Sequence, residues 1–152
     1  MTDPFEPSSA DASHTIARDG EAFIWEPRTG VVLQKAAGVL SLPLMQGFLK
    51  FYSPRLTPGA GVQVFADYER LTHYTKEARD LVAAFTIERR LALERIHLLI
   101  GSKYLALGVN SYRYAVGGDL VFTYSDRESF LGSLQKAMTG TPAVQQDVTA
   151  TR

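Results

Sequence analysis

The sequence of 152 residues contains no cysteine. Without a thiol, the chain cannot form a disulfide, give a thiolate to a metal ion or use a cysteine nucleophile. This absence suits a reducing compartment, and we therefore expect a cytoplasmic protein. The segment Met1–Gly20 also lacks a basic stretch followed by an apolar run, so it is not predicted to be a signal peptide.

Long apolar runs and an excess of charge of one sign are also absent. No stretch of eighteen apolar residues occurs, which predicts no membrane span. Sixteen basic residues balance sixteen acidic ones, so no electrostatic argument favours a nucleic-acid partner. The three histidines, His14, His73 and His97, have no metal-ligand spacing. We expect neither a metal nor a cofactor, and His97 is interpreted as a hydrogen-bonded strand residue.

The chain does contain enough apolar residues for one folded core. Hydrophobic residues make up 45% of the sequence and aromatic residues 11%. The segment Met1–Gly20 is rich in Asp, Ser, Ala and Pro, and residues 139–152 are rich in Thr, Gln and Ala. Such segments bury too little apolar surface to offset chain entropy, so both are predicted to be disordered tails around a domain at residues 21–138.

Two β-prone runs, Phe23–Trp25 and Val31–Leu33, flank the turn Pro27–Gly30 and predict an antiparallel hairpin with a four-residue connection. No guarding charge interrupts Phe23–Trp25. If this run is the edge of a sheet, it invites pairing with a second copy, which makes a homodimer a hypothesis.

Strands and helices alternate along the rest of the domain. Because each helical crossover returns the chain in the same direction, parallel pairing follows. We predict a single α/β domain with a mixed, mostly parallel sheet of about four to five strands, an N-terminal hairpin and about four helices. The segments behind this prediction are three strands near Val62–Ala66, Ile96–Ile100 and Leu120–Tyr124, and four helices. Three of these helices have predicted caps at Ser41, Thr75 and Ser125, and the other follows the turn Gly101-Ser102. The helix after Thr75 is predicted to run to about Leu93.

With this order, the chain resembles the STAS domains, a group that includes the anti-sigma-factor antagonists, and more closely their SpoIIAA-like relatives. The resemblance covers about residues 21–138 and is carried by the segments Gly38–Ser41, Val62–Asp67, Thr75–Ala78, Ile96–Gly101 and Leu120–Leu134. It implies binding of protein partners, or in some branches of a small apolar or nucleotide ligand, rather than catalysis.

In the antagonist branch, the loop after the third strand reads Asp-Ser-Ser-Gly-Leu, and a partner kinase phosphorylates one serine. This chain has Thr72-His-Tyr-Thr75 at that place, which departs from the motif. The resemblance therefore leaves Thr75 first and Thr72 second as candidate phospho-acceptors in a polar hinge. The alternative role of Thr75 is a helix N-cap contributing about 1 kcal/mol.

Residues near this hinge form the remaining candidates for a partner or ligand surface. Asp67 and Glu69 end a strand and are interpreted as a solvated rim rather than an acid–base pair, because no nucleophile accompanies them. Most aromatic residues are expected in the core, and any that stay exposed would mark a docking surface. We predict no catalytic residue; the surface candidates are Asp67, Glu69, His73, Tyr74, Lys76, Phe48, Tyr52 and Tyr104.

Two hypotheses of different classes follow. The first is a non-enzymatic protein–protein interaction module in bacterial signalling or regulation, with a switch at the Thr72–Thr75 hinge. The alternative is a carrier or sensor of a small apolar ligand bound between sheet and helices, and an unrecognised enzyme is the third reading. An apolar cavity of several hundred cubic ångströms would favour the carrier. A filled core with an exposed aromatic patch would favour docking.

Overall fold

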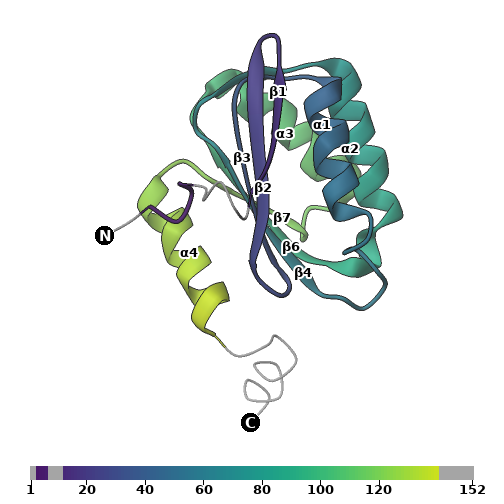
Figure 1. The fold of residues 1–152 in the computed structure, drawn as a ribbon, viewed down its shortest axis with the longest axis vertical. Coiled ribbons are helices and arrows are strands. Elements are labelled where there is room, and N and C mark those ends of the chain that lie inside the picture. The colour runs from purple at the N-terminus through teal and green to yellow at the C-terminus, as the bar shows by residue number, and fades with distance from the viewer. Residues whose placement is uncertain (1–2, 7–11, 141–152) are drawn as a thin grey trace.

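A mixed β-sheet runs through the middle of the protein, with helices on both of its faces (Figure 1). The structure, a computed structural model, describes residues 3–6 and 12–140. In that part of the chain the elements are β1 (Ser13–Ala17), β2 (Gly20–Arg28), β3 (Val31–Leu40), α1 (Leu42–Tyr52), β4 (Val62–Tyr68), β5 (Leu71–Tyr74), α2 (Lys76–Glu88), a 3-10 turn (Arg90–Ala92), β6 (Leu93–Ile100), α3 (Lys103–Val116), β7 (Val121–Tyr124) and α4 (Arg127–Thr139).

The strand order confirms the predicted fold class. The sheet runs β1-β2-β3-β4-β6-β7, and β5 pairs with the far end of β3. Pairing is antiparallel for β1 with β2 and for β2 with β3, and parallel for all other pairs. The sheet therefore has seven strands where four to five were predicted, and the two missed strands are β1 and β5.

The predicted hairpin is formed by β2 and β3, with a tighter turn than expected. Arg28 pairs with Val31, so the connection is Thr29-Gly30 rather than four residues. Gly30 has a φ of 86°, which favours glycine, and its N–H donates to the Glu26 carboxylate at 3.0 Å.

The prediction of a disordered tail at Met1–Gly20 is wrong for the described part of that segment. Ser13–Ala17 forms β1, and Phe5 is fully buried. Backbone pairing with β2 holds β1 in place, and its Ile16 side chain is 73% exposed, so no apolar periodicity announces the strand. Because β1 covers β2, Phe23–Trp25 is not a sheet edge, and the predicted route to a homodimer through it is wrong.

The other tail and the predicted hinge also need correction. Helix α4 extends to Thr139, and residues 141–152 of the predicted C-terminal tail lie outside the described residues. Leu71–Tyr74, which overlaps the predicted Thr72–Thr75 hinge, forms β5, which pairs with Gly38–Leu40 of β3. Gly38 has a φ of 78°, and the register shift there lets β3 change partner from β4 to β5.

The predicted helix N-caps agree only in part with those of the structure. The Thr75 hydroxyl oxygen accepts from the Ala78 N–H at 3.2 Å, which confirms this cap. Ser41 does occupy the N-cap position of α1, but its side chain makes no capping bond. The predicted Ser125 cap is wrong, because Asp126 is the N-cap of α4 and its carboxylate accepts from the Ser129 N–H at 2.8 Å. A carboxylate one residue nearer the helix is the stronger acceptor. Helix α2 ends at Glu88 rather than near Leu93, where β6 begins.

Two separate apolar clusters lie on the two faces of the sheet. Helices α1, α2 and α3 cover the larger one, while α4 and the short segment Asp3–Glu6 cover the smaller one (Figure 1). The smaller cluster is largely aromatic, with Phe5 stacked on Phe130 at a centroid distance of 5.3 Å. The buried members of this cluster are Phe5, Trp25, Val31, Leu33, Phe65, Leu99, Phe130 and Leu134.

Candidate functional site

The carboxyl ends of β4 and β6 reach the edge of the sheet where α2 and α3 begin. Strand β5 lies at this edge against α3, and a side chain added at Gly108 of α3 would collide with the Tyr74 hydroxyl. The main chain of Glu69 approaches Gly101, whose added Cβ would lie 2.6 Å from the Glu69 carbonyl oxygen. The structure therefore brings the predicted hinge and the start of α3 together.

The two candidate phospho-acceptors differ in exposure. The Thr72 side chain is exposed, and its hydroxyl donates to the Gly38 carbonyl at 2.9 Å. Thr75 is half-buried and occupied in capping α2. His73 and Lys76 are exposed, and the Lys76 ammonium lies 3.0 Å from the Asp80 carboxylate. Burial raises the pKa of Tyr74, which is half-buried.

The predicted acids Asp67 and Glu69 meet an arginine that the sequence reasoning missed. The Arg127 guanidinium lies 2.9 Å from Asp67, 3.2 Å from Glu69 and 2.8 Å from Asp3. Asp67 is only 4% exposed, so its interpretation as part of a solvated rim is wrong, whereas Glu69 is exposed. This cluster ties the segment Asp3–Glu6 and the start of α4 to the end of β4.

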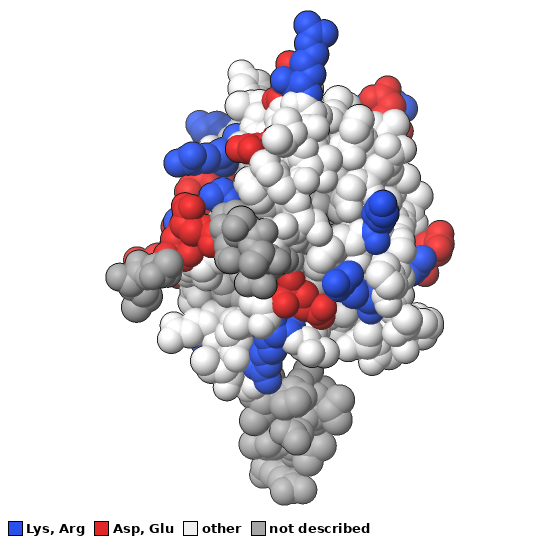
Figure 2. Space-filling model, in the orientation of Figure 1, with Lys and Arg blue, Asp and Glu red and all other residues white. Residues whose placement is uncertain are grey.

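Charged side chains gather on this side of the molecule, whereas few lie over β1, β2 and α1 (Figure 2). A charged pocket of about 210 Å³ beside Arg127 also contains Lys35, whose ammonium lies 3.9 Å from Glu6. The only sequence signal for Arg127 was its place at the start of a helix, next to the end of a strand. The ion pair between Arg127 and Asp67 could not be predicted from local patterns, because the two residues are 60 positions apart in the sequence.

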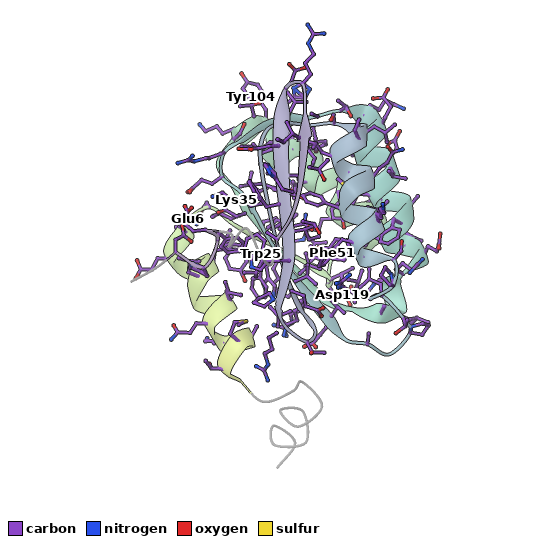
Figure 3. All side chains as sticks on the ribbon, viewed as in Figure 1. Glu6, Trp25, Lys35, Phe51, Tyr104 and Asp119 are labelled. Carbon is purple, nitrogen blue, oxygen red and sulfur yellow. The ribbon has the colours of Figure 1, made fainter. Side chains whose placement is uncertain are left out.

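Of the three aromatic surface candidates, two are in the core. Phe48 is 2% exposed and Tyr52 is 6% exposed, so neither belongs to an exposed partner surface, but both line the cavity described below. They lie on the face of α1 that packs on the sheet. Tyr104 is 86% exposed at the end of the molecule where α3 begins (Figure 3). Leu107 and Tyr114, at 72% and 91% exposure, follow on the same side of α3 at spacings of three and seven residues.

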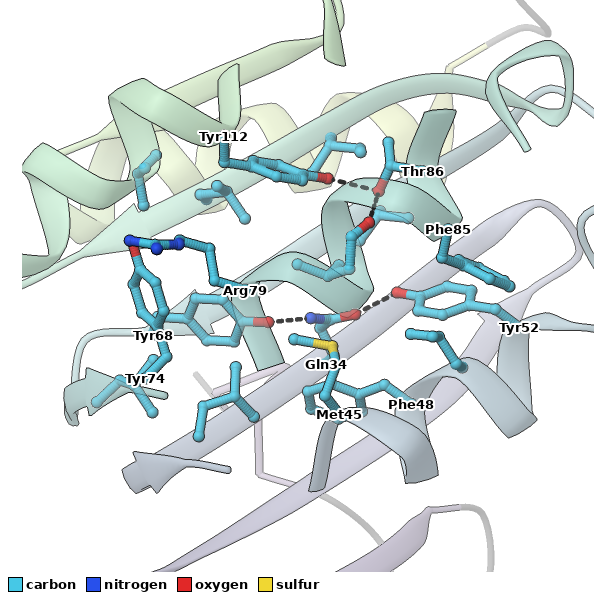
Figure 4. A pocket seen from close by; sticks show the side chains of 18 of the residues that line it. Gln34, Met45, Phe48, Tyr52, Tyr68, Tyr74, Arg79, Phe85, Thr86 and Tyr112 are labelled. Atoms are coloured by element: carbon cyan, nitrogen blue, oxygen red, sulfur yellow. Dashed lines mark hydrogen bonds between the residues drawn. The ribbon is translucent and has the colours of Figure 1, made fainter. Parts of the chain in front are cut away.

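Tyr52 points into an apolar cavity of about 90 Å³ between the sheet and helices α1, α2 and α3 (Figure 4). The polar centre of this cavity is Gln34 on β3, which is 6% exposed. The Tyr52 hydroxyl donates to the Gln34 side-chain oxygen, and the Gln34 amide nitrogen donates to the Tyr68 hydroxyl. Sequence reasoning missed Gln34 and Tyr68, although a lone Gln after Val31-Val-Leu33 was a visible signal.

A second polar pair lies at the helical side of the cavity. The Thr86 hydroxyl donates to the Val82 carbonyl at 2.7 Å and lies 2.8 Å from the Tyr112 hydroxyl. Burial raises the pKa of Tyr112 to about 12 and also raises the pKa values of Tyr52 and Tyr68. All three hydroxyls therefore keep their protons at neutral pH.

His97 lies on the opposite face of the sheet and is 4% exposed. Its ring stacks on Phe65 at a centroid distance of 4.1 Å. Nδ1 lies 2.8 Å from the Tyr124 hydroxyl, and Nε2 lies 3.2 Å from the Gln63 side-chain oxygen, which fits its interpretation as a hydrogen-bonded strand residue. Burial, together with the smaller effect of the nearby Arg95 charge, lowers the pKa of His97 to about 4.

Within residues 3–6 and 12–140, no group of three or more His, Cys, Asp or Glu side chains is placed to hold a metal ion. No helix in the same residues has the length and apolar character needed to cross a membrane.

No protein-family model and no curated protein matches this sequence. Among solved structures, the anti-sigma factor antagonist SpoIIAA in its unphosphorylated form superposes with a TM-score of 0.57 at 16% identity, over 76% of this chain and 96% of that one. An uncharacterised DUF3478-family protein from Shewanella loihica PV-4 with a SpoIIAA-like fold gives 0.54 at 14% identity, over 84% and 98%. The chain has a SpoIIAA-like fold, which confirms the predicted resemblance.

Proposed function

We propose that this protein is a non-enzymatic regulatory module that docks to a protein partner through the outward face of α3. The observation that carries the proposal is the exposure of Tyr104, Leu107 and Tyr114 on one side of that helix. Aromatic side chains give large contact areas and lose few rotamers on binding, so they are frequent at the centres of protein interfaces.

The composition of α3 supports this surface. Its exposed positions include no acidic residue, and Lys103 at the start is the only fully exposed charged one. The side of α3 that packs on the core carries a different set of residues, which are Leu105, Val109 and Val116. The exposed Tyr and Leu residues are therefore not needed for the core, and a partner with a complementary apolar surface would cover them.

The likeness to an anti-sigma factor antagonist supports a protein as the occupant of this surface. By this proposal, the module works in bacterial signalling or regulation in the cytoplasm. As the main function, the carrier hypothesis receives less support, because a cavity of about 90 Å³ is well below the several hundred cubic ångströms of common small-molecule sites and has room for one small ring at most.

A switch at the Thr72–Thr75 segment is the finer part of the proposal. A phosphate on Thr75 would lie at the positive end of α2, close to Lys76 and Arg79. The same end of the sheet carries the start of α3 and Tyr104, so added negative charge there would change the docking surface without unfolding α2. Intact-mass analysis of protein from the native host tests whether the modified form exists.

The docking proposal is tested by site-specific photo-cross-linking. A photoreactive residue at position 107 is expected to capture a defined partner in cells of the source organism, whereas the same residue at position 91 is not. Leu91 is a matched control because it is 81% exposed but lies outside α3.

Binding of the captured partner is then measured by calorimetry with purified proteins. Tyr104→Ala and Tyr114→Ala together are expected to weaken it by about thirtyfold or more, as for central aromatic contacts. Leu91→Ala is expected to leave it unchanged. Equal cross-linking at both positions, or an affinity insensitive to the double substitution, would contradict the proposal.

A further inference from the structure

The cavity beneath α2 has a structural cause. Helix α2 packs mainly against its neighbours α1 and α3 rather than against the strands. Only Ala78 and Thr86 of this helix are buried, while Val82 and Phe85 are half-buried and line the cavity. The helix therefore stands away from the sheet, and tyrosine side chains reach into the space between the two layers (Figure 4).

At the polar centre of the cavity, some of the hydrogen-bond donor hydrogens have no acceptor. Tyr52 and Tyr68 each bring one O–H, and the Gln34 carboxamide brings two N–H groups. Two of these four hydrogens are used, one from Tyr52 to Gln34 and one from Gln34 to Tyr68. One hydroxyl hydrogen and one amide hydrogen have no acceptor among the described residues.

This count does not depend on which way the amide of Gln34 is turned. If its oxygen and nitrogen are exchanged, Tyr68 donates to the oxygen and Tyr52 accepts from the nitrogen. Two donor hydrogens are again left over. Because both tyrosines stay protonated at neutral pH, this excess of donors persists. Buried donors without acceptors are unfavourable, so a molecule that supplies an acceptor is stabilised there.

The lining also limits the charge and size of such a molecule. Arg79 is the only charged side chain of the lining, and its guanidinium lies 3.9 Å from the Asp80 carboxylate. The side chains bonded to Gln34 are the uncharged Tyr52 and Tyr68, so an ion beside them would be buried without a charged group in this network. A cavity of about 150 Å³ is known to hold benzene, so about 90 Å³ suits a molecule no larger than one small ring.

We propose that the cavity is a binding site for a small, uncharged, mainly apolar molecule with one hydrogen-bond acceptor, such as a carbonyl oxygen. The acceptor lies against the Gln34 carboxamide and its two tyrosines and receives one of the two hydrogens that are left over. The apolar part lies under Val82 and Phe85. This site is separate from the α3 docking surface, so either proposal stands or fails alone.

The test uses two probes of nearly equal shape, cyclopentanone and methylenecyclopentane, which differ in whether an oxygen or a CH₂ group occupies one position. Titration of the full chain is followed by ¹H–¹⁵N NMR. Cyclopentanone is expected to bind about fivefold more tightly and to shift the side-chain N–H signals of Gln34. Equal affinity of the two probes, no binding of either, or unmoved Gln34 signals would overturn the proposal.

A pair of variants tests the location. Val82→Phe places a ring in the cavity and is expected to abolish binding of cyclopentanone. Ala84→Phe adds the same side chain at an exposed position of α2 and is expected to leave binding unchanged. Binding that survives Val82→Phe in a folded protein would overturn the assignment to this cavity. The comparison of the two probes needs neither variant, so a failure of Val82→Phe to fold leaves the proposal testable.

Discussion

The two faces of the sheet are packed in different ways. On the α4 face, the ring of Phe130 contacts the rings of Phe5 and Phe65, and all three side chains are fully buried. On the face covered by α1, α2 and α3, the apolar side chains of α2 are half-buried above a cavity with Gln34 at its centre. One face is closed by aromatic packing, and the other keeps room beneath a helix.

The difference indicates a division of roles within one small domain. Tight packing of large rings makes a face sensitive to any loss of volume. A helix that rests on its neighbours rather than on the sheet leaves a cavity beneath it, which is the space that the proposed ligand would occupy. Four measurements compare the two faces, beginning with the largest expected effect.

Removal of one aromatic ring from each face should have unequal costs. Phe130→Ala is expected to lower the free energy of unfolding by about 4 kcal/mol, because a fully buried ring leaves a cavity. Phe85→Ala, at a half-buried position above an existing cavity, is expected to cost about 1 to 2 kcal/mol. Urea denaturation measures both, and equal costs would contradict the proposed difference between the faces.

The ion-pair cluster at the edge of the α4 face should be the next most sensitive point. Arg127→Met leaves the buried carboxylate of Asp67 without its cation and is expected to cost about 3 kcal/mol. Lys76→Met is the control, because its pair with Asp80 is exposed and should contribute less than about 0.5 kcal/mol. A loss for Arg127→Met as small as that of the control would show that the cluster is not stabilising.

Acid should destabilise the α4 face through His97. Its pKa is about 4 in the folded protein and 6.5 in the reference state, so the unfolded chain binds the proton more strongly. The stability contributed by the neutral ring is complete above about pH 6.5 and is lost as the pH falls toward 4. Between pH 7.5 and pH 5 the expected loss is about 2 kcal/mol.

The measurement is a series of urea denaturations across that pH range. His97→Gln removes the titrating ring and should flatten the pH dependence. His73→Gln, at an exposed position of β5, should leave it unchanged. A pH profile unaffected by His97→Gln would contradict the prediction.

The smallest effect should come from deleting one hydroxyl on each face. Tyr124→Phe removes the hydroxyl that lies 2.8 Å from His97 and 2.9 Å from Ser133, with an expected cost of about 1.5 kcal/mol. Tyr52→Phe should cost only about 0.5 kcal/mol, because the spare hydrogen of Tyr68 can bond the Gln34 oxygen once the amide turns. Thermal or urea unfolding compares the two, and a larger cost for Tyr52→Phe would contradict the donor excess.

Local patterns in the sequence predicted most of the fold. The β-prone runs around Thr29-Gly30 predicted the hairpin, and alternating strands and helices predicted the parallel part of the sheet. The position of Thr75 directly before Lys76 correctly predicted that it caps α2. Strand β1 escaped prediction because it gains its place from backbone pairing rather than from buried side chains. Its exposed side chains leave no periodic signal in the sequence.

The candidate sites were predicted less completely, because their members come from distant parts of the chain. The sequence singled out Asp67, Glu69 and Tyr52 individually. Spacing of apolar residues and turn residues acts over a few positions, and it was enough to determine the order and type of most elements. The meeting of Arg127 with Asp67, 60 residues away, and of Gln34 with Tyr68, 34 residues away, was decided by the strand order and by how each helix packs. The physical reason is that these contacts depend on which strands become neighbours and on how far α2 stands from the sheet, and neither property is encoded within a local window.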